Sequence, residues 1–191
     1  MIYTSKMQKA IKFAIKTHDL YQKQTRKGKG TAYITHPLTV GFILACANAP
    51  EDVIVAGILH DTIEDSIEEK KVTYEMLQER FGTHAADIVQ SVTETSKGLS
   101  WEKRKEEALK HIEKFSPESF LVKSADIISN ISELVDDYAR YGDEVFSRFN
   151  APKEKILDNY IKVIETIIVK WDENPLREDL MDVGKKLKKI R

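Results

Sequence analysis

The segment VIVAGILHDTIEDS, residues 53–66, places four ionisable side chains directly after an apolar run. On a helix that advances 100° per residue, His60, Asp61, Glu64 and Asp65 fall on an arc of about 140°. Three carboxylates this close repel one another unless a cation is present or some of them are protonated. A divalent metal removes that repulsion, because it takes imidazole nitrogen and carboxylate oxygen as ligands. The segment therefore predicts a metal site whose remaining ligands come from elsewhere in the chain.

Two residues outside this segment are candidates for the remaining ligands. His36 lies at the start of a predicted helix that begins with THP, where its side chain can point into a cleft. Asp126 interrupts the apolar stretch SFLVKSADIISNI, and Asn130 follows one turn later on the same face. A carboxylate on the apolar side of a helix requires a partner, and a metal is an adequate one. Together with His60 and Asp61, these ligands leave coordination positions open for water and substrate.

Each of these residues, taken alone, also has an ordinary structural interpretation. A histidine at a helix start is often a cap or a surface residue, and His-Asp pairs are common by chance. Asp126 could be a buried acid bonded to Ser129 or to a backbone amide. Glu64 and Asp65 could end a helix and face solvent, although acids near a helix C-terminus oppose its dipole. The joint pattern favours the metal site.

A basic loop precedes His36 in the sequence. The segment RKGKG carries Arg26, Lys27 and Lys29 together with two glycines. Phosphate-rich ligands require such charges. A lysine-rich loop that is merely solvated is the alternative, and it would be preferred without the neighbouring metal site. The loop is therefore interpreted as a candidate substrate-binding segment.

Apolar residues recur at helical spacing along most of the chain, and no Asn-Gly hairpin joins alternating strands. The sequence therefore predicts an all-α fold. A length of 191 residues fits one domain, 1–191, with a full core. Helices are expected over residues 10–18, 36–48, 51–66, 74–81, 84–95, 101–114, 117–139 and 152–171, with a last basic-ended helix in the tail.

Composition limits the classes of partner and the compartment. The formal net charge of −1 gives no global basic field, so nucleic acid is not an expected partner. The single cysteine, Cys46, cannot form an internal disulfide and fits a reducing compartment. No apolar stretch approaches the roughly 20 residues that span a bilayer, and the N-terminus lacks a signal-peptide pattern. A cytoplasmic protein without a membrane partner is expected.

Four segments, in this order, resemble the HD-domain metal-dependent phosphohydrolases. They are RKGKGTAYITHPLTV, AGILHDTIEDS, ERFGTHAADIVQSVTETS and LVKSADIISNI. The combination is more narrowly similar to the hydrolase domain of the RelA/SpoT type and to the single-domain small alarmone hydrolases. The resemblance covers about residues 10–135, and the C-terminal helices over residues 143–191 match less distinctly. It implies one HD-type helical bundle of roughly eight to ten helices, and a hydrolase without a synthetase domain.

The resemblance implies a role for each matching residue. His36, His60, Asp61 and Asp126 would hold one divalent ion, typically manganese (Mn²⁺). Glu64 and Asp65 would handle the attacking water and proton transfer, and which of them removes the proton stays open. The nucleotide would be contacted by Arg26 and Lys27 from the basic loop, where Lys29 also lies, and by Asn130. The implied reaction removes the 3′-pyrophosphate of guanosine 3′,5′-bis(diphosphate), ppGpp, and yields GDP and pyrophosphate.

Besides Ala32, which stands where the family often has a proline before YITHP, two positions depart from the family pattern. The family carries a basic residue directly after the aspartate of VKxADxxxN and often an arginine just beyond the asparagine, where this chain has Ile127 and Ser132. Two alternatives therefore stay open. One is a phosphohydrolase for another nucleotide or dinucleotide phosphate, and the other is a nucleotide- or metal-binding module without turnover. The oligomeric state is not predicted.

Overall fold

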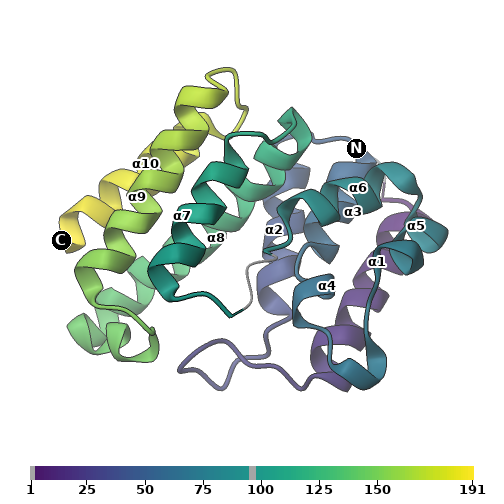
Figure 1. Ribbon diagram of the computed structural model, residues 1–191, viewed down its shortest axis with the longest axis horizontal. Coiled ribbons are helices and arrows are strands. Elements are labelled where there is room, and N and C mark those ends of the chain that lie inside the picture. Colours follow the sequence, from purple (N-terminus) through teal and green to yellow (C-terminus); the bar gives the residue numbers. More distant parts are fainter. Residues whose placement is uncertain (1–2, 95–97) are drawn as a thin grey trace.

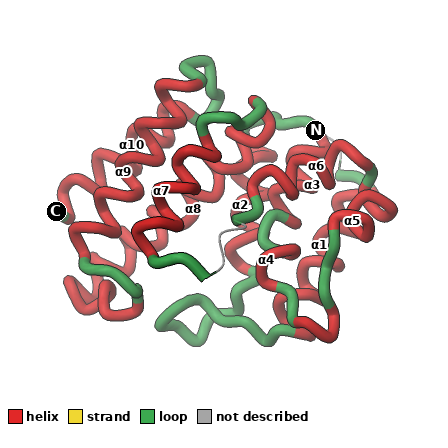
Figure 2. The backbone as a smooth tube through the Cα atoms, in the orientation of Figure 1, coloured by secondary structure: helices red, strands yellow, loops and turns green. Residues whose placement is uncertain are grey.

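The structure, a computed structural model, describes residues 3–94 and 98–191, and this part of the chain contains helices and no strands (Figures 1 and 2). The α-helices are α1 Ser5–Ile15, α2 Thr35–Cys46, α3 Glu51–Leu59, α4 Thr62–Asp65, α5 Tyr74–Phe81, α6 Thr83–Val92, α7 Trp101–Ile112, α8 Pro117–Tyr141, α9 Lys153–Lys170 and α10 Arg177–Ile190. A π-helix spans Lys16–Tyr21, and 3₁₀-helices span Glu68–Lys70 and Gly142–Arg148. The predicted all-α fold is confirmed. None of the described helices combines the length and apolarity that a membrane span requires.

Several helix ends follow the capping residues in the sequence. Thr73 and Ser116 each accept a hydrogen bond from the backbone N–H three residues later, at 3.4 and 3.2 Å. Gly82 ends α5 with φ of 86°, and Gly142 ends α8 with φ of 58°. Glycine adopts these positive values at little cost. The predicted helix over 84–95 ends earlier, with α6, and its last residue, Thr95, lies outside the described residues.

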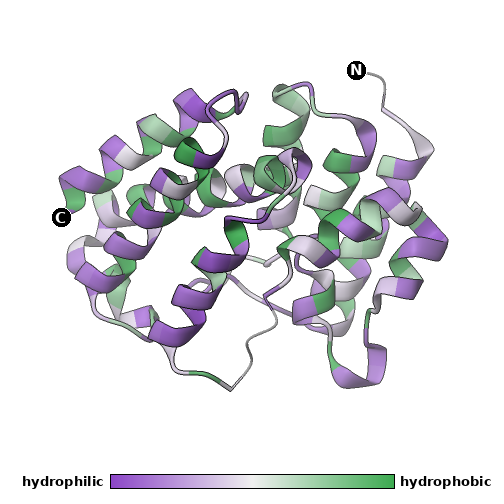
Figure 3. Cartoon of the chain, turned by 45° about the horizontal axis from the view of Figure 1, so that its top comes forward, coloured by the Kyte–Doolittle hydropathy of each residue, from purple (hydrophilic) through white to green (hydrophobic). Residues whose placement is uncertain are grey.

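Helix α8 is the central element of the fold. It packs against α2, α3 and α6 on one side and against α9 and α10 on another (Figure 1). Its buried residues include apolar side chains along its length, and also Asp126. In Figure 3, α10 turns a hydrophilic side outward and a hydrophobic side toward its neighbours, as expected of an amphipathic helix. One shared core therefore supports the helices on both sides of α8.

The prediction of a single helix over residues 51–66 is wrong, because the structure has two helices there. Helix α3 ends at Leu59, and α4 begins only after a turn at His60 and Asp61. Side chains in this turn compete with the helix for backbone carbonyl groups. His60 Nδ1 donates to the carbonyl of Gly57 at 2.8 Å, and Thr62 Oγ1 donates to that of Leu59 at 2.7 Å. The ionisable side chains are therefore arranged around a turn rather than along one helix face.

Helices α2 and α3 approach each other closely because both carry a glycine at the contact. A Cβ atom added at Gly41 would lie 2.5 Å from Cγ1 of Ile58, and one added at Gly57 would lie 2.2 Å from Cδ1 of Leu44. The two helices run antiparallel, so this contact brings the start of α2 beside the end of α3. The rings of His36 and His60 consequently lie 5.2 Å apart, centroid to centroid.

We expect Gly41→Ala to destabilise the protein by about 1–3 kcal/mol, because the added methyl group overpacks the α2–α3 contact. This cost exceeds the about 0.5–1 kcal/mol that alanine gains over glycine inside a helix. Gly184→Ala in α10 is the matched control, since its Cβ would meet Ile164 at an ordinary 3.4 Å. Thermal unfolding of both variants measures the difference. A Gly41→Ala variant as stable as Gly184→Ala would contradict the proposed steric role.

Candidate metal centre and adjoining cavities

Three separate segments bring His36, His60, Asp61 and Asp126 to one point in the core. His36 comes from the first turn of α2, His60 and Asp61 from the α3–α4 turn, and Asp126 from α8. Nε2 of His36 lies 3.2 Å from Oδ1 of Asp126 and 3.8 Å from Oδ2 of Asp61. Nε2 of His60 lies 3.1 Å from the same Asp61 oxygen and 4.0 Å from the same Asp126 oxygen. The convergence that the sequence predicts is present in the structure.

The hydrogen bonds of the two histidines leave their Nε2 atoms directed at this point. His60 Nδ1 faces the carbonyl of Gly57, which can only accept, so the ring proton lies on Nδ1. His36 Nδ1 lies 3.0 Å from the hydroxyl of Ser129, which can accept in the same way. Nε2 of His60 is buried and lies beside the carboxylate oxygens of Asp61 and Asp126. A buried imidazole nitrogen among carboxylate oxygens suits a divalent cation, which would take the place of the proton on Nε2. One ligand atom each from His36, His60 and Asp126 lies within 4.8 Å of the other two.

The cluster holds like and unlike charges in a buried place. Burial favours neutral His60, but the carboxylates of Asp61 and Asp126 outweigh it and raise the pKa of His60 to about 9. Burial also opposes ionisation of Asp61 and Asp126. The pKa of Asp61 is nevertheless lowered, chiefly by His60, and that of Asp126 is lowered, chiefly by Lys123. Without a metal, a proton on His60 therefore supplies part of the positive charge that the carboxylates require.

Neighbouring side chains fix the orientation of both aspartates. Lys123, one turn before Asp126 on α8, donates to Asp126 Oδ2 at 2.7 Å, and the Asn130 amide donates to Oδ1. The Tyr33 hydroxyl donates to Oδ2 of Asp61. Such partners hold metal-ligating carboxylates in place.

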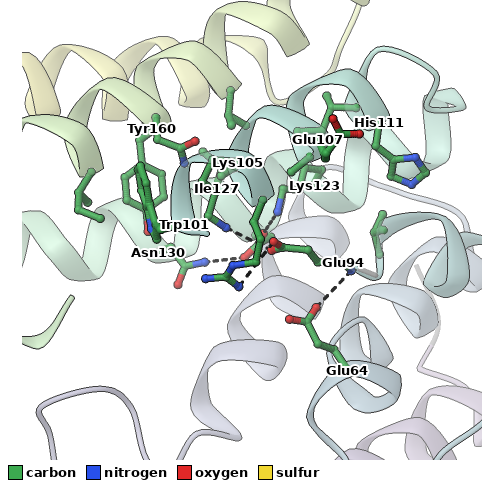
Figure 4. Close-up of a pocket in the computed structure, with 18 of the residues that line it drawn as sticks. Glu64, Glu94, Trp101, Lys105, Glu107, His111, Lys123, Ile127, Asn130 and Tyr160 are labelled. Carbon is green, nitrogen blue, oxygen red and sulfur yellow. Dashed lines mark hydrogen bonds and ion pairs between the residues drawn. The ribbon is translucent and has the colours of Figure 1, made fainter. Parts of the chain in front are cut away.

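The two remaining acids of the segment, Glu64 and Asp65, occupy different positions. Glu64 lines the space beside the cluster, and its Oε2 accepts the backbone N–H of Glu94 at 3.2 Å (Figure 4). Asp65 lines neither of the two cavities described below, as far as the described residues define them, and its Oδ2 accepts from Gln24 at 2.8 Å. Burial raises the pKa of both acids, and the charge of Asp61 raises both further. Sequence patterns do not distinguish the two acids, whereas the structure brings Glu64 to the cavities.

Two adjoining cavities open beside the cluster. The smaller, about 330 Å³, contains His36, His60, Asp61 and Asp126 in its wall. The larger, about 650 Å³, is lined by α7, α8 and α9 and shares Glu64 and Asp126 with the smaller one. Figure 4 shows the larger cavity, with Trp101 and Tyr160 on one side. The combined space has one wall of ionisable groups and another of aromatic and apolar groups, which suits a ligand with a charged end and a planar end.

The basic loop lies at the smaller cavity, but two of its cations are paired with acids of α8. Arg26 Nε donates to Glu133 at 2.8 Å, and Arg26 also donates to the side-chain oxygen of Asn130 at 2.8 Å. Lys29 lies 2.6 Å from Glu133 and 2.7 Å from Asp137. Burial opposes ionisation of Glu133, yet the hydrogen bonds from Arg26 and then Lys29 lower its pKa to about 2. All four predicted substrate-binding residues, Arg26, Lys27, Lys29 and Asn130, line the smaller cavity.

Ile127 and Ser132, which stand at usually basic positions of the family pattern, differ in their distance from the cavities: only Ile127 is among the described residues that line one. Ile127 is buried and lines the larger cavity. Ser132 is exposed and is not among the described residues that line either cavity. Arg148, from the 3₁₀-helix that follows α8, lines the smaller cavity and donates to Asp137. A cation from another segment therefore reaches this space.

Sequence reasoning missed several residues of the site. Lys123 could have been found, because it precedes Asp126 by three residues and so shares its helix face. Tyr160 has the helical spacing of a core residue in the segment over 152–171, but it also forms a cavity wall. Burial and then the charge of Asp126 raise the pKa of Tyr160 to about 12. Trp101, Glu133 and Asp137 carry no local signal, since only the packing of α7 and α8 brings them to the cavities or the basic loop.

Known proteins resemble this chain in sequence and in fold. The family model of the HD domain matches residues 10–156. The guanosine-3′,5′-bis(diphosphate) 3′-pyrophosphohydrolase MESH1 of Danio rerio is 35% identical over 133 residues, which are 69% of this chain and 70% of that protein. The guanosine-3′,5′-bis(diphosphate) 3′-pyrophosphohydrolase of Aquifex aeolicus is 33% identical over 138 residues, which are 69% of this chain but only 18% of that protein.

Among solved structures, a metazoan ortholog of SpoT that hydrolyses ppGpp superposes with a TM-score of 0.72, covering 100% of this chain and 96% of that one. At 23% identity, this likeness concerns the fold alone. A Listeria monocytogenes protein superposes with a TM-score of 0.71 at 28% identity, covering 81% of this chain and 97% of that one. The HD-type bundle is therefore the observed fold.

The raised pKa of His60 predicts how metal-free protein responds to pH. The folded-state pKa, about 9, lies above the ordinary value of 6.5, so protonation of His60 stabilises the fold. This contribution is complete below pH 6.5 and is lost as pH rises through about 9. With chelator present, the melting temperature should fall by at least about 3 °C over this range. Saturating Mn²⁺ should reduce the fall, because the ion takes over the balancing of charge.

His60→Gln should remove the pH-dependent fall in melting temperature, since glutamine does not titrate. His84→Gln is the matched control, because the His84 side chain is 58% exposed and lies outside the cluster. A fall that persists unchanged in His60→Gln would contradict the assignment of the charge to His60.

Proposed function

This chain belongs to the HD-domain family, and we propose that it is a metal-dependent phosphohydrolase that removes the 3′-pyrophosphate of ppGpp. The products are GDP and pyrophosphate. The observation that carries the proposal is the meeting of two histidines and two aspartates, with Nε2 of the buried His60 ring directed at their centre. Relatives named for this reaction, at 33% and 35% identity, support the choice of substrate. Residues 1–191 are proposed to act as one domain, in the cytoplasm.

The proposed metal ligands are His36, His60, Asp61 and Asp126. When bound, a divalent ion supplies a Lewis acid that acidifies water and offsets charge on a phosphoryl group. Mixed imidazole and carboxylate ligands suit first-row divalent metals, and manganese is the proposed ion. Asn130 and Lys123 keep the Asp126 carboxylate in its orientation.

Glu64 is the proposed general base. It lines both cavities, and burial raises its pKa, so it accepts a proton more readily than an exposed glutamate does. In the proposed step, the oxygen of water bonds to the phosphorus nearest the ribose, and the bond from that phosphorus to the 3′ oxygen breaks. Glu64 takes one proton of the water, and this proton passes to the 3′ oxygen, which leaves as a hydroxyl group.

The proposed binding mode follows the polarity of the cavities. Arg26, Lys27 and Lys29 supply positive charge at the smaller cavity, where the phosphates would lie. Asn130 stands between the two cavities, in reach of the sugar and its phosphate. The aromatic walls of the larger cavity, Trp101 and Tyr160, offer surfaces for the planar base.

A different nucleotide phosphate is the second candidate substrate. Its support is specific: Ile127 presents an apolar side chain to the larger cavity, and Arg26 and Lys29 are already paired with Glu133. Both features lower the positive charge that is free to meet a guanosine bearing two diphosphates. Assaying phosphorylated nucleotides side by side distinguishes the candidates, because a wide preference for ppGpp eliminates the second one.

We expect purified protein loaded with Mn²⁺ to release pyrophosphate from ppGpp, and Asp61→Ala to reduce the rate by about 10²–10³-fold or more, because a ligand is lost. Removing the metal with a chelator should have a similar effect, and restoring it should restore the rate. The measurement is pyrophosphate release under steady-state conditions.

Asp87→Ala on α6 is the matched control, since Asp87 is exposed and bonds only to Tyr74 among the contacts in the described residues. It should retain the wild-type rate. Wild-type protein that binds metal but leaves ppGpp and the other nucleotides intact would contradict hydrolysis and favour a binding module.

A further inference from the structure

The side chain of Gln24 connects a buried histidine to Asp65. Its Oε1 lies 3.0 Å from His18 Nδ1, and its Nε2 donates to Asp65 Oδ2 at 2.8 Å. The amide oxygen therefore faces a ring nitrogen that can donate, and the amide nitrogen faces a carboxylate oxygen that accepts. Gln24 belongs to the segment between the π-helix and α2, which Figure 1 shows running beneath α4 in that view.

The backbone of Gln24 is held as firmly as its side chain. Its N–H donates to the carbonyl of His18 at 2.9 Å, and its carbonyl accepts from the N–H of Tyr33 at 2.9 Å. The hydroxyl of the same Tyr33 donates to Asp61. Gln24 and Tyr33 are thus joined by a backbone hydrogen bond. Gln24 contacts Asp65, and Tyr33 contacts Asp61.

His18 determines which way the Gln24 amide points. The ring is fully buried, at 0% exposure, because the π-helix Lys16–Tyr21 turns it inward. Burial lowers the pKa of His18, so the ring is neutral at pH 7. Since Oε1 of Gln24 can only accept, the ring proton lies on Nδ1. A flipped amide would place its oxygen against the Asp65 carboxylate and would leave the His18 proton without an acceptor.

We propose that His18 and Gln24 are positioning residues, which fix the carboxylate of Asp65 beside the proposed base Glu64. The proposal rests on the proposed function, because it concerns the acids assigned to hydrolysis. A hydrogen bond to Oδ2 restricts rotation of the Asp65 carboxylate and so fixes where its negative charge lies relative to Glu64. Asp65 lines neither cavity within the described residues, so its placement affects the chemical step and leaves substrate binding unchanged.

Gln24→Met keeps the shape of the side chain and removes both hydrogen bonds. We expect kcat for ppGpp to fall by about 10–100-fold, the usual effect of losing a group that orients active-site ligands. KM should stay within about twofold, because no substrate contact is lost. Gln78→Met on α5 is the matched control, since Gln78 is exposed and bonds Thr83. An unchanged kcat, or a change confined to KM, would overturn the proposal.

Substitutions of His18 separate positioning from packing. His18→Leu should lower kcat like Gln24→Met, whereas His18→Asn should retain most of it, because an asparagine amide nitrogen can replace Nδ1 as the donor. In the double variant His18→Leu/Gln24→Met, kcat should match that of Gln24→Met alone. Losses that multiply in the double variant would show two independent packing effects and would overturn the proposal.

A measurement that does not require catalysis distinguishes failure of the positioning proposal from failure of the proposed function. NMR of ¹⁵N-labelled wild-type protein should show His18 as the neutral Nδ1–H tautomer at pH 7, and Gln24→Met should weaken that signature. If His18 carries its proton on Nε2, the positioning proposal fails even where ppGpp is hydrolysed. If the Nδ1–H tautomer is present but ppGpp stays intact, the proposed function fails. Should Gln24→Met not fold, wild-type NMR and the His18 variants decide the outcome.

Discussion

Mutual repulsion among buried carboxylates is the constraint on which this structure depends. Asp61 and Asp126 lie inside the helical bundle with Glu64 and Asp65 close by, and burial alone would make their ionisation costly. Positive charge at short range stabilises the ionised carboxylates. It comes from Lys123 and, when metal is absent, from protonated His60. A divalent ion would replace the proton on His60. Folding and the proposed metal binding would therefore be coupled at one point, where α2, the α3–α4 turn and α8 meet.

The same principle of local pairing operates at the basic loop beside the smaller cavity. Arg26 and Lys29 are held by Glu133, and Lys29 and Arg148 are held by Asp137, so two acids on α8 keep three cations from other segments at the smaller cavity. These acids hold the basic loop in place while reducing its net charge. A polyphosphate ligand would have to compete with these acids for the cations. The pairing would therefore favour ligands that bind the cations more strongly than the acids do.

Helices α2 and α8 and the α3–α4 turn carry the proposed metal ligands, and close helix packing determines their spacing. The glycines at the α2–α3 contact let the two histidine-bearing helix ends approach, and α8 spans both parts of the bundle. The irregular segment between the π-helix and α2 contacts two acids, Asp65 through Gln24 and Asp61 through Tyr33. This segment therefore contacts one proposed metal ligand, Asp61, as well as Asp65.

The sequence by itself determined the helical class, most helix ends and the identity of the clustered residues, because apolar periodicity, capping residues and charge repulsion are local in origin. His36, His60, Asp61 and Asp126 could be selected this way, since each breaks an apolar pattern or begins a helix. Only the tertiary structure decided that the helix breaks at His60, that Glu64 rather than Asp65 faces the cavity, and that Glu133 holds Arg26. These outcomes depend on contacts between residues far apart in the chain, such as Gln24 with Asp65, for which short-range patterns carry no signal.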